Sequence, residues 1–140
     1  MSFDIYISAL SGGKITTIKR SIVTDAFAEL IGIVDRVGWQ LILPDWGLCS
    51  GHFYIDDSLD VDSFSINRPP LVPVFAAALY TVMRQTPTVL MWPGIGPDPR
   101  CCVADPAVIK EMPPDMIEAL GMPTVVHSGE EIIDCISRSA

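Results

Sequence analysis

Two histidines, His52 and His127, are the side chains that could act as general bases near neutral pH. Ser128 follows His127 directly, and a serine beside a base can serve as a nucleophile. Neither histidine lies in a recognisable nucleophile motif. Ser128 and Glu131, three residues apart, instead match a capping box, the pattern that starts a helix. We therefore predict no catalytic residue.

Metal ligands are the next chemistry to weigh. Cys49 and His52 have the spacing of half a zinc site, but no second half follows along the chain. The acidic run 56–62 resembles the start of a calcium loop, yet Leu59 and Val61 stand where ligands are needed and no glycine follows. The sequence thus predicts no metal site and no other cofactor. We expect Cys49 in a turn and His52 on a partly exposed strand.

The strongest functional pattern is an acidic segment with aromatic residues between positions 44 and 67. It carries five aspartates and no lysine or arginine. Tryptophan and tyrosine often anchor protein interfaces, and carboxylates steer a basic partner by long-range attraction. The alternative interpretation is a solvated turn whose charge only keeps the protein soluble. We predict a partner-binding surface made of Asp45, Trp46, Tyr54, Asp56, Asp57, Asp60 and Asp62.

The overall charge restricts the kinds of partner. The chain has 17 acidic and 9 basic residues and a formal net charge of −8 at pH 7. Nucleic acids and anionic membranes are bound through clustered lysine and arginine, so we expect neither as a partner. The start of the chain lacks the pattern of a secretory signal, which predicts a cytoplasmic protein with reduced cysteines. A monomer and a homodimer both remain open.

One strand–helix–strand unit is expected to organise the fold. Residues 63–67 alternate as a strand does, and residues 71–85 are apolar on nearly every side, which is typical of a buried helix. That apolar stretch is shorter than the roughly 20 residues that a membrane span needs. Residues 88–92 are a continuous apolar strand, so the unit should be a βαβ crossover. Function is then expected in the loops at its two ends, 56–62 and 93–100.

Shorter patterns predict the other elements. Strands are expected at 3–10, 39–43, 52–55, 101–104 and 124–127, and helices at 21–37, 105–112, 115–120 and 132–137. Short connections make strands 39–43, 52–55 and 63–67 an antiparallel meander. Cys101 and Cys102 would face opposite sides of their strand. We predict one α+β domain, residues 1–140, with a mixed, mostly antiparallel sheet, one central βαβ crossover and helices packed on the sheet.

In overall style the chain resembles the small cytosolic immunity proteins that neutralise bacterial polymorphic toxins. The shared features are an initial strand, FDIYIS, a single α+β domain, strong acidity and no assembled active site. The resemblance implies a non-catalytic protein that blocks a basic toxin domain, for example a nuclease, by stoichiometric binding. It carries over no functional residue. The alternatives are an acidic secretion chaperone and a small enzyme with a site near Cys49, His52 or His127.

Overall fold

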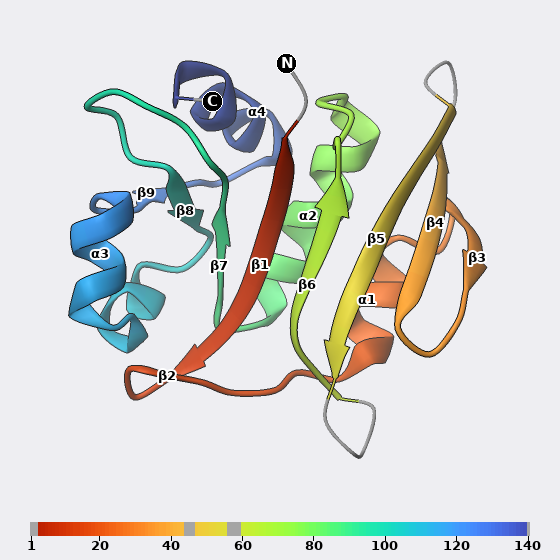
Figure 1. Ribbon diagram of the computed structural model, residues 1–140, viewed down its shortest axis with the longest axis horizontal. Coiled ribbons are helices and arrows are strands. Elements are labelled where there is room, and N and C mark those ends of the chain that lie inside the picture. The colour runs from red at the N-terminus through yellow and green to blue at the C-terminus, as the bar shows by residue number, and fades with distance from the viewer. Residues whose placement is uncertain (1–2, 44–46, 56–59, 140) are drawn as a thin grey trace.

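The computed structural model describes residues 3–43, 47–55 and 60–139, which form a sheet with helices packed on it (Figure 1). Within these residues the sheet has nine strands in the order β3-β4-β5-β6-β1-β7-β8-β9, with β2 paired to β1 beside this path. The strands are β1 (Asp4–Ser11), β2 (Lys14–Ile15), β3 (Ile31–Val34), β4 (Gly38–Leu43), β5 (Gly47–Ile55), β6 (Val61–Asn67), β7 (Thr88–Met91), β8 (Cys101–Val103) and β9 (Thr124–Val125). The helices are α1 (Arg20–Ala26), α2 (Pro73–Gln85), the 3-10 helix η1 (Pro106–Glu111), α3 (Pro114–Leu120) and α4 (Gly129–Ser139).

The predicted crossover is present, with one strand inserted in it. Strands β6 and β7 are joined by α2 and are both antiparallel to β1, so they run parallel to each other on either side of it. Only β8 and β9 are parallel neighbours among the described strands. Strand β1 suits this central place because Ile5, Ile7 and Leu10 are all buried. The α+β class and the mixed, mostly antiparallel sheet are confirmed.

The main core lies between one face of the sheet and helices α1, α2 and α4, seen behind the strands in Figure 1. Helix α2 buries Phe75, Leu79 and Val82 against the sheet, as its apolar sequence predicts. Aromatic rings fill the space beside α1, where the Phe27 and Trp39 ring centroids are 4.9 Å apart. No helix among the described residues is long and apolar enough to cross a membrane. We call this side of the sheet the covered face.

The other side of the sheet is covered only in part. Helices η1 and α3 pack there over β7, β8 and one end of β1, around a second apolar cluster that includes Leu10, Val89 and Val108. Over β3, β4, β5 and β6 no helix of the described chain is present, as the front of Figure 1 shows. Cys101 belongs to the second cluster and Cys102 to the main core, so the two thiols face opposite sides, as predicted.

The helix predicted over 21–37 is wrong in its second half. Helix α1 ends at Ala26, a turn closed by hydrogen bonds to the carbonyl of Phe27 follows, and the chain continues as β3. Apolar residues at Leu30, Ile31 and Val34 fit a helical stripe, but they fit the end of a turn and an edge strand equally well. The β-branched side chains favour the strand, and pairing with β4 satisfies its backbone.

Strand β5 is longer than predicted. It starts at Gly47, and residues 47–51, expected to belong to a turn, pair with β4. Cys49, expected in that turn, is therefore a buried strand residue. Gly51 permits this pairing, because a side chain there would overlap the Trp39 indole and the Ser65 carbonyl. The predicted helix 105–112 is a 3-10 helix, with Asp105 accepting a hydrogen bond from Ala107 N at 2.9 Å.

Candidate functional site

The uncovered half of the sheet presents the outward side chains of four strands, β4, β5, β6 and β1. Along β5, Cys49 and Phe53 point into the core, whereas His52 and Tyr54 point out. Strands β4, β6 and β1 also direct successive side chains to opposite sides, and on β1 and β6 the small Ser8 and Ser65 side chains of the open side are themselves buried. We call this surface the open face, and its residues are Tyr6, Ser8, Gln40, Ile42, Leu48, Ser50, His52, Tyr54, Ser63 and Ser65.

The rings of Tyr6, His52 and Tyr54 project from the open face, and small serine side chains lie between them. Tyr6 lies opposite Ser65 on the neighbouring strand, and Ser65 in turn lies opposite His52. Tyr54 is opposite Ser63, and its ring meets that of His52 edge-on with centroids 4.7 Å apart. Tyr6 and Tyr54 remain 40% and 45% exposed. The small serines leave the rings projecting as a ridge that a partner could contact on both sides.

A hollow lies on each side of this ridge. The first has a volume of about 220 Å³, and the second, where β1 and β7 meet the end of α3, has about 430 Å³. The first is lined by Ile33, Asp35, Gly38, Trp39, Gln40, Ser50 and Gly51. The second is lined by Asp4, Tyr6, Met91, Trp92, Pro93 and Leu120. The open face is thus a ridge between two depressions and not a flat sheet surface.

The charges near the open face are at its border. Its ten residues include one histidine, His52, but no Asp, Glu, Lys or Arg, whereas Asp4, Asp35 and Asp62 lie at its edges. Val37 N and Gly38 N donate to the Asp35 carboxylate at 3.0 and 2.7 Å. These two hydrogen bonds lower the pKa of Asp35 below its ordinary 3.8, and the bond from Gly38 has the largest effect. The nearby charges of Arg20 and His52 lower the pKa further. The border is therefore acidic at neutral pH.

Arg20 fixes the turn that carries Asp35. Its guanidinium donates to the carbonyl of Arg36 at 3.1 Å and to that of Asp35, and it lies 4.7 Å from the centroid of the Phe53 ring. The first residue of α1 is therefore tied to the β3–β4 turn. This contact holds one corner of the open face against the core.

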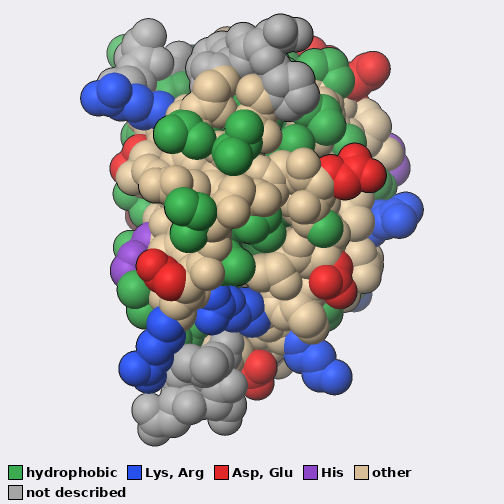
Figure 2. Space-filling view, turned by 90° about the vertical axis from the view of Figure 1, so that its right-hand side faces the viewer, with side chains coloured by type: hydrophobic (Ala, Val, Ile, Leu, Met, Phe, Trp, Pro, Cys, Tyr) green, Lys and Arg blue, Asp and Glu red, His purple; other side chains and the backbone are tan. Residues whose placement is uncertain are grey.

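The apolar surface continues from the open face onto the β3 edge. Figure 2, which looks at this edge, shows hydrophobic and uncharged atoms in its upper middle and charged side chains around them. Strand β3 ends the sheet on this side, so its outer backbone edge pairs with no strand of the described chain. The exposed large hydrophobic side chains of this region are Ile33, Val34, Val37, Ile42 and Leu48.

The structure describes three of the seven predicted partner-binding residues. Tyr54 lies on the open face, and Asp60 and Asp62 stand at the start of β6, the end of the sheet that Tyr54 approaches. Asp45, Trp46, Asp56 and Asp57 lie outside the described residues. Gly47, which follows residues 44–46, is the first residue of β5, and Ile55, which precedes residues 56–59, is the last. The two ends of this nine-residue strand are about 25 Å apart.

The sequence predicts His52 as a partly exposed strand residue, which the structure confirms, but it assigns neither His52 nor Tyr6 to a binding surface. The available signal was alternation: Tyr6 stands between Ile5 and Ile7, both buried, so it had to point to the other side of β1. Alternation alone does not say whether that side is covered by a helix. The sequence predicts the helix 115–120, but not where this helix, α3, packs on the sheet, and that placement decides whether Tyr6 is covered.

The loop 93–100 lies at the other end of the sheet from Asp60 and Asp62, because β7 runs parallel to β6 and the loop follows its last residues. Arg100 holds it in place by donating to the carbonyls of Gly94, at 3.3 Å, and Ala119. Trp92 anchors its start through a 2.8 Å hydrogen bond from the indole to the Ser139 hydroxyl. Asp60, Asp62 and this loop therefore do not form one continuous surface.

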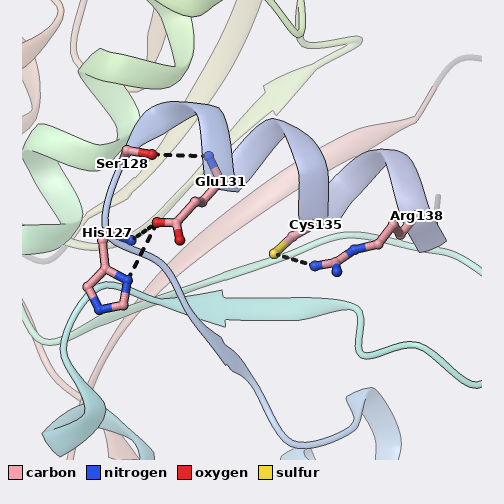
Figure 3. A network of polar contacts seen from close by, with 5 residues as sticks. All are labelled: His127, Ser128, Glu131, Cys135 and Arg138. Carbon is pink, nitrogen blue, oxygen red and sulfur yellow. Dashed lines mark hydrogen bonds and ion pairs between the residues drawn. The ribbon is translucent and has the colours of Figure 1, made fainter.

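His127 and Ser128 stand at the start of α4, with the Ser128 hydroxyl accepting from Glu131 N at 3.2 Å (Figure 3). This is the helix cap that the sequence predicts, with the Glu131 carboxylate accepting from His127 N at 2.5 Å. The His127 ring is 74% exposed and its Nδ1 lies 3.5 Å from the same carboxylate. Ser128 and Glu131 thus serve the helix N-terminus.

The cysteines are free thiols buried in the protein. Burial raises the pKa of Cys49 and of Cys101 to about 11, and it raises the pKa of Cys102 well above its ordinary value. These thiols are therefore protonated at neutral pH and poor nucleophiles. Cys49 donates to the Asn67 carbonyl at 3.2 Å on the covered side, while His52 points to the open face. Over residues 3–43, 47–55 and 60–139, no group of three or more metal-ligating side chains is assembled.

Comparison with known proteins gives no relative: no family model, no curated protein and no solved structure matches this chain.

Proposed function

We propose that the protein is a non-catalytic binding protein whose open face docks on a protein partner. We further propose that the partner is a basic toxin domain, which the protein neutralises in the cytoplasm by stoichiometric binding. The observation that carries the proposal is the uncovered ridge of Tyr6, His52 and Tyr54. These rings form a surface without an Asp, Glu, Lys or Arg side chain, bordered by aspartates.

The composition of the open face agrees with that of protein interfaces. Interface centres are depleted in charged residues and enriched in tyrosine, and polar groups lie at the rim. Tyrosine supplies a large contact area with few rotatable bonds, so ordering it on binding costs little entropy. Strands β3, β4, β5, β6 and β1 together span a footprint of roughly 500 Å². This is a large share of the roughly 800 Å² that each partner contributes to a standard interface.

The charge supports a basic partner. A net charge of −8 attracts positively charged proteins over several ångströms, and the aspartates Asp4, Asp35 and Asp62 bring part of that charge to the edge of the docking surface. Rim charges mainly raise association rates and exclude acidic competitors. The rings would then supply most of the binding free energy.

A small enzyme finds less support. His52 lies on the open face, and His127 lies at the start of α4, which packs on the other side of the sheet with α2. The Cys49 thiol is in the core, and its pKa is raised to about 11. These three residues, the candidates for catalysis, therefore belong to three separate environments.

An acidic secretion chaperone is the second candidate because of the β3 edge. A chaperone of this kind holds an extended client segment, and an unpaired edge strand can accept such a segment as an additional strand. Strand β3 offers four residues, with exposed Ile33 and Val34. A partner that binds only when unfolded would favour this function over neutralisation of a folded toxin.

The test is neutralisation of the toxin domain of a large secreted protein encoded next to this gene. Wild-type protein should restore growth of cells that express that domain and should bind it one to one. The double variant Tyr6→Ala, Tyr54→Ala should weaken binding about 100-fold or more, because two interface anchors are removed, and should abolish rescue. The control is Val74→Ala on α2, a residue that is 45% exposed but lies on the covered side.

Two results would reject the proposal. The first is a wild-type protein that neither binds nor neutralises the folded toxin domain. The second is a double variant, with an unchanged denaturation curve, that binds as well as Val74→Ala does.

A further inference from the structure

The larger depression beside the ridge has its own chemistry, and we call it the Asp4 hollow. It has a volume of about 430 Å³ and lies between Tyr6 of β1, Met91 of β7 and Leu120, the last residue of α3. Tyr6 and Met91 are opposite each other in the sheet, so their side chains form its floor. The last residue of α3, Leu120, forms one wall of the hollow.

The end of α3 is fixed at this place. Gly121 follows Leu120 with a backbone φ of 93°, a conformation that residues other than glycine rarely adopt. The Leu120 carbonyl accepts a hydrogen bond from Arg100 N at 2.9 Å, and Arg100 also donates to Ala119. The wall of the hollow is therefore held by the loop that precedes β8 and does not depend on a partner.

Asp4 gives the hollow a single charge. The other side chains around it are the Tyr6 phenol and the apolar Met91, Pro93 and Leu120, with the buried Trp92 beneath. Asp4 is partly buried, and within the described part of the chain its carboxylate makes no hydrogen bond or ion pair. Nor does any lysine or arginine of the described residues line the hollow. A partly buried carboxylate gains free energy when a cation or donor completes its contacts.

We propose that the Asp4 hollow receives one arginine side chain of the docked partner, an inference that rests on the proposed function. The methylene stem would lie on Met91 and Leu120, the guanidinium would stack beside the Tyr6 ring, and its N–H groups would donate to the Asp4 carboxylate. Arginine fits these three contacts together, because its plane stacks on aromatic rings and its fork of donors matches a carboxylate.

Charge decides between arginine and other occupants. An aliphatic side chain would fill the hollow but would remove water from Asp4 without replacing its hydrogen bonds. An acidic side chain would be repelled. The volume, at the lower end of the 300–1,000 Å³ typical of small-ligand pockets, suits one long side chain.

The test uses the complete protein and two small probes, N-acetyl-arginine methylamide and its uncharged isostere N-acetyl-citrulline methylamide. Each is titrated into ¹⁵N-labelled protein at low salt while amide shifts are followed. The arginine probe should give saturable shifts at Asp4, Tyr6, Met91 and Leu120 with a dissociation constant of about 1–10 mM. The citrulline probe should bind about fivefold or more weakly, because it lacks the charge-assisted hydrogen bond.

Three variants test whether Asp4 causes the preference for the arginine probe over the citrulline probe. Asp4→Asn keeps the shape of the side chain and should make the two probes bind equally. Asp62→Asn, at another border of the open face, should leave the fivefold preference intact. Tyr6→Leu tests the hollow independently: it should weaken both probes by a similar factor and keep the preference for arginine, because Asp4 is still present.

Equal binding of the two probes to wild-type protein would overturn the inference. So would an arginine preference that persists in Asp4→Asn, or shifts centred away from the hollow. Because no toxin is used, this result is independent of the proposed function. A protein that neutralises its toxin but shows no arginine preference would reject only the inference about the hollow.

Discussion

Strand β5 contributes Phe53 to the covered face and Tyr54 to the open face, and the two neighbours meet very different surroundings. Phe53 is fully buried among Trp39 and Phe64, with Arg20 over its ring. Tyr54 contacts the His52 ring and remains 45% exposed. The covered face is therefore completed by the helices of the same chain. The open face has equally large rings but no helix of the described chain to bury them.

This difference separates residues that maintain the fold from residues that are free to bind. Scattered exposed apolar residues are ordinary, but aligned rings on neighbouring strands are a larger feature. On the covered face the loss of a ring leaves a cavity. On the open face solvent can fill the space that a half-exposed ring leaves, so the fold should tolerate the change.

The largest expected effect tests this separation directly. Phe53→Ala should lower the free energy of unfolding by about 3–5 kcal/mol, because it empties a close-packed site. Tyr54→Ala should change it by less than about 1 kcal/mol. Chemical denaturation of both variants measures this, and similar losses would show that the two faces are equally part of the core.

The second-largest expected effect is on the affinity for the partner when His52 or His127 is replaced singly. His52→Ala should weaken toxin binding about tenfold, because it removes one ring of the ridge and the support of Tyr54. His127→Ala, an exposed ring at the start of α4, should leave binding unchanged. Titration calorimetry of both variants with the toxin domain measures the affinity. A larger loss of affinity in His127→Ala than in His52→Ala would place the binding surface on the other side of the protein.

A smaller effect is expected from the acidic segment 56–62. Changing Asp56, Asp57, Asp60 and Asp62 together to Asn should slow association several-fold and flatten its dependence on salt, because long-range attraction is reduced. Dissociation should change little. Stopped-flow association rates measured across a salt series test this, with Glu130→Gln and Asp134→Asn on α4 as the control pair. Unchanged rates would remove the acidic segment from the binding surface.

The smallest effect is the pH dependence that Asp35 contributes. Hydrogen bonds from Gly38 and Val37 hold its pKa below the ordinary 3.8. Its contribution to stability is therefore fully present above that value and is lost as the pH falls through the lower, folded pKa. Asp35→Asn should reduce the loss of stability on acidification below pH 4, measured as the denaturation midpoint against pH. A steeper loss in the variant would contradict this sign.

Much of the covered face could be predicted from the sequence. Helix α2, strands β1, β6 and β7, and the cap at Ser128 follow from local patterns that the tertiary structure keeps. The opposite orientations of Cys101 and Cys102 follow from strand geometry alone. These features depend on neighbours in the chain or on a strongly apolar stretch.

The open face could be predicted only in part. Tyr54 was expected at a binding surface, but Tyr6 was not, because its exposure depends on where α3 packs on the sheet. The strand β3 was mistaken for helix because Leu30, Ile31 and Val34 satisfy both periods, and only pairing with β4 decides. Both failures concern contacts between distant segments.

The most direct test of the open face is hydroxyl-radical footprinting of side chains with and without the bound toxin domain. Binding to the open face predicts that oxidation of Tyr6, His52 and Tyr54 falls several-fold in the complex, because the partner covers their rings. Oxidation of His127 and Met122, which are exposed outside the open face, should stay the same. Protection of His127 and Met122 with continued oxidation of the three rings would contradict the account.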